Sequence, residues 1–142
     1  EGIAAAENAM GANRPIDYKT VPSCIYTQPE AASVGLTQKQ AIDAGYKIKV
    51  GRFPMSANGK ALIEGLDGFV KVIANERYGE VLGVHILGPH ATELIAEAAL
   101  ALKLEATVDE FTSTVHPHPS VSEAVAEAAL AVDNIALHIP NK

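Results

Sequence analysis

Two β-rich segments in the middle of the chain constrain its fold more than any other feature. They span residues 69–74 and 81–87, and the connection between them, residues 75–79, has the length of a longer hairpin loop. Strands joined by so short a connection pair in the antiparallel direction. Gly83, inside the second segment, allows another backbone to approach closely. We therefore predict an antiparallel sheet at the centre of the fold.

Helix and strand signals on both sides of this hairpin predict an α+β fold. Thr37 and Gln40 have the spacing of a capping box, and Gly45 follows where a left-handed helix end is expected. The predicted strands are residues 20–27 and 46–54, the predicted helices are 37–45, 92–104 and 120–132, and residues 56–60 and 108–113 are predicted as a turn and a short helical turn. The patterns thus favour a central antiparallel sheet packed with helices.

The last predicted helix is amphipathic, because its apolar side chains fall on one face and its acidic side chains fall elsewhere. The apolar set is Val121, Ala124, Val125, Ala128 and Val132, and the acidic set is Glu123, Glu127 and Asp133. We expect the apolar face to be buried and the acidic set to lie outside it.

The chain has 142 residues, enough for one domain that folds without a disulfide or a metal. Residues 1–14 have the composition of a helix or linker from a preceding domain, and residues 15–142 are expected to form the domain itself. Because the first residue is Glu1 rather than methionine, we expect the sequence to be a fragment of a longer protein.

The net charge of −6 argues against a nucleic-acid partner, since the 11 basic residues are scattered along the chain. There is no run of about 18 apolar residues and no secretory signal pattern, so we expect neither a membrane span nor secretion. The expected location is the cytoplasm, or the mitochondrial matrix if the protein is eukaryotic.

The cysteine and the histidines give little support for a disulfide or a metal site. Cys24 has no partner for an internal disulfide, and we interpret it as a small apolar residue of a strand rather than a reactive thiol. The histidines lack the usual spacing of zinc ligands, so we expect no metal. We interpret His85 as a hydrogen-bonded strand residue and His90 as an exposed turn residue.

Residues 114–123 combine titratable groups with a stiffened backbone, and we call the part before Glu123 the His-Pro connector. Pro117 and Pro119 each fix their own φ near about −65° and push His116 and His118 toward extended or turn geometry. Either His-Pro bond is free to be trans or cis. The two imidazoles are therefore expected to sit on a rigid segment.

Glu123 follows the connector in the first turn of a helix, and its position has two interpretations. In the first, Ser120 and Glu123 form a capping box: the Ser120 hydroxyl accepts a first-turn N–H, and the Glu123 carboxylate accepts the Ser120 amide. In the second, the chain doubles back so that Glu123 accepts an N–H from the His118 ring and fixes its tautomer, as a general base near neutral pH requires. Spacing alone favours the capping box.

The hexapeptide H-P-S-V-S-E, residues 118–123, resembles the H-P-[ST]-x-S-E signature that closes the pyridine nucleotide-disulfide oxidoreductases. Residues 21–30, 68–72 and 83–89 resemble segments of the dihydrolipoamide dehydrogenase branch of this family in the same order. The resemblance covers nearly the whole chain. It implies the C-terminal dimerisation domain of an FAD- and NAD-linked reductase, residues 15–142, which works as a homodimer.

The resemblance also implies roles for two residues of the motif. His118 would be the acid-base catalyst that takes a proton from a dihydrolipoamide thiol, and Glu123 would orient it. The backbone of His118 and Pro119 would lie near the flavin of the partner subunit. The chain departs from the commonest family pattern at Pro117, where a small residue is usual, and at Ser120, where threonine is usual.

The cofactors implied by the resemblance would be held elsewhere. The chain has no G-x-G-x-x-G loop and a single cysteine, so FAD, NAD and the redox-active disulfide would belong to other domains of the full enzyme. The fragment alone is expected to be inactive and to hold no cofactor. The implied partners are a second copy of the enzyme, lipoamide as substrate, and the acyltransferase component of a 2-oxoacid dehydrogenase complex.

Two other functions are open. The chain would also suit the interface domain of another flavoprotein disulfide reductase, such as a glutathione reductase. It would equally suit a purely structural assembly module, in which neither His118 nor Glu123 takes part in chemistry. Upstream sequence with a dinucleotide-binding loop and a redox cysteine pair would distinguish an enzyme from an assembly module.

Overall fold

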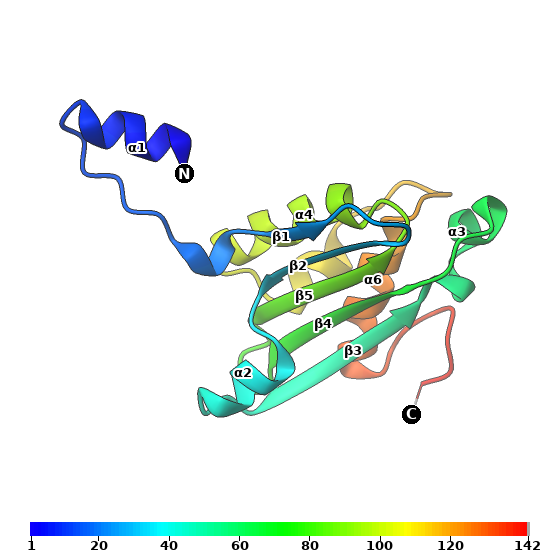
Figure 1. Ribbon diagram of the computed structural model, residues 1–142. Helices are drawn as coiled ribbons and strands as arrows, with labels where there is room; N and C mark the ends of the chain where they lie inside the picture. Colours follow the sequence, from blue (N-terminus) through cyan, green and yellow to red (C-terminus); the bar gives the residue numbers. More distant parts are fainter. Residues whose placement is uncertain (142) are drawn as a thin grey trace.

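The predicted antiparallel sheet is present in the computed structural model, which describes residues 1–141 and has five strands in that range (Figure 1). The strands are β1 (Ser23–Ile25), β2 (Glu30–Gly35), β3 (Ile48–Pro54), β4 (Phe69–Asn75) and β5 (Val81–Gly88). Their order across the sheet is β1-β2-β5-β4-β3, and each neighbouring pair is antiparallel. The α+β fold with a central antiparallel sheet is therefore confirmed.

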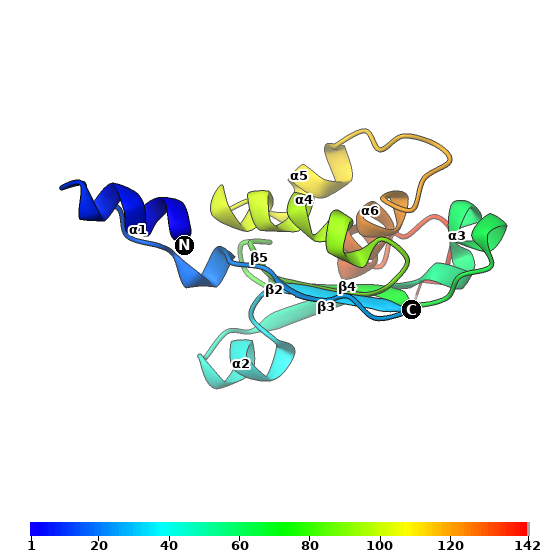
Figure 2. The ribbon, with the colours of Figure 1, turned by 45° about the horizontal axis from the view of Figure 1, so that its top comes forward.

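Helices cover the two faces of the sheet unequally (Figure 2). The helices are α1 (Gly2–Ala9), α2 (Gln38–Asp43), α3 (Gly59–Glu64), α4 (Ala91–Lys103), α5 (Val108–Ser113) and α6 (Glu123–Leu130), with short 3-10 turns η1 (Tyr18–Thr20), η2 (Met55–Ala57) and η3 (Ala131–Asp133). α4 packs on β2 and β5, α6 packs on β3 and β4, and α5 packs on α6. α2 lies on the opposite face, and α1 stands away from the sheet. Every helix among residues 1–141 is too short or too polar to cross a membrane.

The core lies between the sheet and the helices α4 and α6. Alternate residues of the central strands point into it, among them Val72 on β4 and Val84 on β5, which face each other in the register. They belong to the same hydrophobic cluster as Ile95 of α4 and Val125 of α6, and all four side chains are buried. Fully burying a side chain of this kind stabilises the fold by about 1.5–3 kcal/mol. All five apolar residues predicted on the face of the last helix are buried, as expected.

The hairpin and the best-marked helix agree with the predictions. β4 and β5 are paired neighbours, and a Cβ at Gly83 would lie 2.1 Å from the Leu36 carbonyl oxygen, which confirms the close backbone approach. The capping box of Thr37 and Gln40 is present at the start of α2. Gly45 follows that helix with a φ of +87°, in the left-handed region that glycine tolerates.

The strand predictions were incomplete. β2 was not predicted, because its sequence E-A-A-S-V-G is poor in β-branched and aromatic residues. It is a strand nonetheless because β1 and β5 pair with its two edges. The predicted strand at 20–27 is shorter in the structure, since its first residue belongs to η1 and only β1 remains.

Two helix predictions need correction. Residues 56–60, predicted as a turn, contain the end of η2 and the start of α3, where the Asn58 side chain accepts the Ala61 N–H and begins the helix. The last helix begins at Glu123 rather than at Ser120, because the Ser120 hydroxyl donates to the Pro117 carbonyl instead of capping a helix there. The helix continues into η3.

Gly51 on β3 allows α6 to lie very close to the sheet. A Cβ at this position would be 2.0 Å from the Ala128 carbonyl oxygen of α6 and 2.6 Å from the backbone nitrogen of Val132 in η3. Both are backbone atoms, so no change of side-chain rotamer would relieve the clash. The position of α6, and with it of Glu123 at its first turn, depends on this glycine.

Candidate active site

The His-Pro connector runs from the end of α5 to the start of α6 and brings His118 back onto Glu123. The Nδ1 atom of His118 lies 2.9 Å from Oε1 of Glu123, and the Ser120 amide donates to Oε2 of the same carboxylate at 2.9 Å. The His118 side chain is 80% exposed, and its peptide bond to Pro119 is cis. One carboxylate therefore holds both the imidazole and the backbone of the connector.

The capping box predicted for Ser120 and Glu123 is only half formed. The Glu123 half is present, but the Ser120 hydroxyl donates to the Pro117 carbonyl and contacts Ser122 Oγ instead of accepting a helical N–H. Ser122 is the residue that precedes α6, and it makes no side-chain cap bond. The Glu123 carboxylate thus makes both interactions: it forms half of the predicted cap, and it also binds His118, as the second interpretation expected.

The protonation of this pair follows from its hydrogen bonds. Burial raises the pKa of Glu123, but the hydrogen bonds from the Ser120 amide and the His118 ring bring the pKa below its ordinary value. An ionised carboxylate can only accept, so Nδ1 of His118 carries the hydrogen and Nε2 of the neutral ring keeps its lone pair. An exposed Nε2 of this kind can take a proton from a bound substrate.

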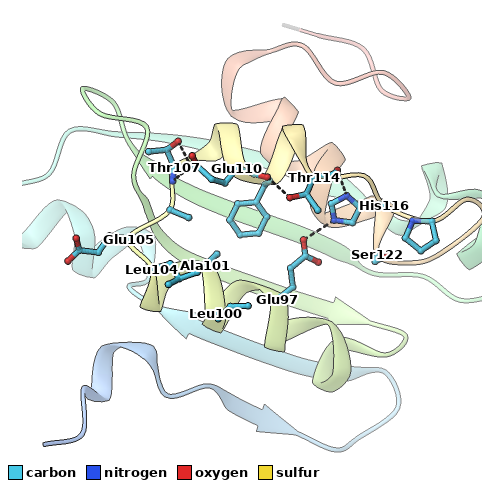
Figure 3. A pocket seen from close by; sticks show the side chains of 13 residues that line it. Glu97, Leu100, Ala101, Leu104, Glu105, Thr107, Glu110, Thr114, His116 and Ser122 are labelled. Atoms are coloured by element: carbon cyan, nitrogen blue, oxygen red, sulfur yellow. Dashed lines mark hydrogen bonds and ion pairs between the residues drawn. The ribbon is translucent and has the colours of Figure 1, made fainter.

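His116, the other imidazole of the connector, has a buried side chain that is 7% exposed. Its Nε2 lies 2.8 Å from Oε1 of Glu97 on α4, and its Nδ1 lies 3.0 Å from the Thr114 carbonyl oxygen (Figure 3). It stands at the edge of a cavity of about 600 Å³ between α4 and α5, lined by apolar side chains that include Leu100 and Phe111. His116 therefore ties the connector to α4 and presents no free nitrogen to solvent.

Glu127 contradicts the expectation that the acidic residues of the last helix lie outside the core, because it is buried. Its Oε2 accepts the backbone N–H groups of Leu137 at 3.0 Å and His138 at 3.2 Å, and its Oε1 lies 2.8 Å from Nδ1 of His138. A buried carboxylate is tolerated when it is hydrogen-bonded in this way. Glu127 thus fastens the segment after η3 to α6, one helical turn from Glu123.

The remaining histidines and the cysteine match their predicted roles. His85 Nε2 lies 3.0 Å from the Leu36 carbonyl oxygen, and burial lowers the pKa of His85. His90 is exposed in the turn before α4, and Cys24 is half-buried in β1. Within residues 1–141, no group of three or more His, Cys, Asp or Glu side chains could hold a metal ion.

The long-range contacts of three polar residues were missed by the sequence analysis. Asn58 donates from Nδ2 to the Ser120 carbonyl oxygen at 3.0 Å, and the other two are Glu97 and Glu127. Their partners lie 62, 19 and 11 residues away along the chain. No local pattern identifies contacts over such separations, although a polar residue between apolar neighbours, as at Glu97 and Glu127, is a weak signal.

Comparison with known proteins decides the family of the chain. The family model described as the pyridine nucleotide-disulphide oxidoreductase dimerisation domain matches residues 21–129. The chain belongs to this family. The match covers the sheet from β1 onward, the connector, and most of α6, so the dimerisation domain includes the His118 and Glu123 pair.

The relatives of this dimerisation domain are longer than the chain itself. It is 53% identical over 140 residues to a dihydrolipoyl dehydrogenase of Bacillus subtilis. The aligned region covers 97% of the chain and 30% of the relative. It is 51% identical over 143 residues to a dihydrolipoyl dehydrogenase of Thermus scotoductus, and this aligned region covers the whole chain and 31% of the relative. The crystal structure of LpdA from Mycobacterium tuberculosis superposes with a TM-score of 0.82 at 32% identity, over 90% of this chain and 28% of that one. The chain thus spans about 30% of the length of the curated relatives that it matches.

Proposed function

We propose that this dimerisation domain belongs to a dihydrolipoamide dehydrogenase and contributes His118 and Glu123 to the active site of the partner subunit. The contact between His118 Nδ1 and Glu123, beside an exposed Nε2, is the observation that carries the proposal. The names of the relatives at 53% and 51% identity support dihydrolipoamide as the substrate rather than glutathione. Residues 15–142 form the domain, and residues 1–14 lead into it.

In the proposed reaction, His118 removes the proton from a thiol of dihydrolipoamide through Nε2. The resulting thiolate forms an S–S bond with one sulfur of the enzyme's redox disulfide, and the disulfide bond of the enzyme breaks. Glu123 keeps the hydrogen on Nδ1 in place and stabilises the positive charge that the ring gains. When bound, FAD supplies the route by which the two electrons pass on to NAD.

The surface of the connector fits a place against a partner subunit that carries FAD. His118 and Pro119 are exposed, so both the imidazole and the adjoining backbone are available for contact with a flavin edge. The lipoamide would arrive on the acyltransferase component of a 2-oxoacid dehydrogenase complex. The contacts of Asn58 and Glu97 with the connector go to Ser120 and His116 rather than to His118 or Pro119.

The first test is assembly. We expect the chain to sediment as a dimer at tens of micromolar, because large apolar side chains remain exposed at the end of α4, in the connector and near the end of the chain. Leu100, Leu104, Val115 and Leu137 are all more than half exposed. Analytical ultracentrifugation measures this directly. A compact monomer over the whole accessible concentration range would contradict the dimeric assembly.

The second test concerns Glu123. The lowered pKa means that its ionised form stabilises the fold fully above the unfolded pKa of about 4.3, and that this stability is lost as the pH falls through the folded value. Glu123→Gln should therefore flatten the acid side of the curve of Tm against pH. In the flavoenzyme that contains this chain, it should also lower dihydrolipoamide turnover, less than loss of His118 does, because the base remains but is oriented less well.

The same variant distinguishes the dyad from a simple cap. If Glu123 only stabilises the start of α6, its replacement should change the free energy of unfolding by about 1 kcal/mol or less and leave the pH dependence of turnover unchanged. Thr107 and Glu110 form a complete capping box at the start of α5, so Glu110→Gln is a matched control. A Glu123 variant that behaves like the Glu110 variant in turnover would support the assembly-module function.

A further inference from the structure

We propose that Asn58 is a positioning residue for the His118 and Glu123 pair, and that it acts by holding the carbonyl group of Ser120. This inference rests on the proposed function, because it assigns a part of the same site. Asn58 precedes α3, in a region that the sequence predicts only as a turn. It lies 62 residues from Ser120 along the chain.

Both ends of the Asn58 side chain are used, and the residue is only 4% exposed. Its Oδ1 accepts the Ala61 N–H at 2.9 Å and begins α3, while its Nδ2 donates to the Ser120 carbonyl oxygen at 3.0 Å. A helix cap alone needs an oxygen acceptor, which serine or aspartate supplies as well. The donor half of the amide has no part in the cap and serves the connector instead.

Ser120 transmits the contact to the catalytic pair. Its carbonyl group is held by Asn58, and its N–H donates to Oε2 of Glu123, whose Oε1 binds His118. The two backbone groups of one residue thus join the buried amide to the carboxylate. If the carbonyl lost its donor, the peptide groups around Ser120 would be free to turn, and the amide would leave Glu123.

Asn58 is held rigidly, whereas the part of the connector that carries His118 is exposed. Asn58 lies between Met55 and Ala61, which are both fully buried, so its position is fixed by the core. His118 and Pro119, in contrast, face solvent and have no packing of their own to hold them. His116 and Glu97 hold the first half of the connector, and Asn58 holds the second half.

The test uses variants that remove the hydrogen bond donated by Asn58 to Ser120 but keep the oxygen that caps α3. Asn58→Asp keeps an oxygen for the Ala61 N–H at nearly the same volume, but an ionised aspartate cannot donate to Ser120. Asn58→Ser also keeps a cap oxygen and is too short to reach the Ser120 carbonyl. Thr37→Ala is the matched control, because it removes the cap of α2, far from the connector. The variants are made in the flavoenzyme that contains this chain.

Amide hydrogen exchange at Ser120 and steady-state turnover are the two measurements. Both Asn58 variants should speed Ser120 exchange by at least about tenfold. They should lower kcat for dihydrolipoamide by about ten- to a hundredfold, since small displacements of a catalytic group are costly. NADH oxidation by an artificial electron acceptor should be unchanged. Thr37→Ala should alter neither measurement, even if it lowers the Tm as much as the Asn58 variants do.

The outcomes distinguish this inference from the proposed function. If both Asn58 variants match Thr37→Ala in Ser120 exchange and in kcat, Asn58 is a helix cap only and the inference is overturned. If the Asn58 variants speed Ser120 exchange while His118→Gln keeps full turnover, the proposed function fails, and the structural hold on Ser120 stands without a catalytic consequence.

Discussion

In the proposed full-length dihydrolipoamide dehydrogenase, replacing His118 with glutamine is expected to lower dihydrolipoamide oxidation by about a hundredfold or more. This is the usual contribution of a positioned general base. Glutamine keeps a polar side chain near Glu123 but cannot take the thiol proton. Oxidation of NADH by an artificial electron acceptor should largely persist, because hydride transfer to flavin requires no proton to be removed by this imidazole. Steady-state rates with the two electron acceptors measure the asymmetry.

A second histidine provides the control for this result. His90 is exposed at the start of α4 with a φ of 57°, which asparagine tolerates, so His90→Asn removes an imidazole without disturbing the backbone. It should leave both activities intact. Normal dihydrolipoamide turnover in the His118 variant would exclude His118 as the base.

The largest expected effect on stability comes from Gly51. An added methyl group would meet the backbone of Ala128 at 2.0 Å, so Gly51→Ala must push α6 away from β3. Such overpacking costs about 1–3 kcal/mol, and each kcal/mol lowers the Tm of a chain of this size by about 3–5 °C. Differential scanning calorimetry measures the change. Because Glu123 moves with α6, the variant should also weaken the hold on His118.

Gly59 is the matched control for this substitution. It lies in the first turn of α3, where a Cβ would have nothing within 4 Å. Gly59→Ala should leave the Tm unchanged or raise it, since alanine favours the helix. Equal stability of the Gly51 and Gly59 variants would show that α6 can shift on the sheet without cost.

Features encoded within a few residues were predictable, and features that depend on distant partners were not. The hairpin of β4 and β5 and the capping box of Thr37 follow from local spacing, and the structure has both. The role of Glu123 was ambiguous, because its separation from Ser120 along the sequence suits a capping box and its separation from His118 suits a dyad. In the structure, one carboxylate oxygen binds the Ser120 amide and the other binds His118.

The missed features have a common physical cause. β2 has a composition of low strand propensity and depends on β1 and β5, which lie outside it in the sequence. Glu127 was expected outside the core because a carboxylate is rarely buried, and its burial depends on N–H groups from a later loop. The hold of Asn58 on Ser120 similarly joins two segments that no periodicity relates.

The placement of Glu123 and Glu127 on one helix limits how the length of this region can vary. Each carboxylate binds an imidazole, and α6 fixes their separation at one turn. One residue inserted between them would rotate one glutamate relative to the other by about 100°, so His118 and His138 could no longer both be held. Insertions and deletions among homologous sequences should therefore be absent from the turn of α6 between Glu123 and Glu127.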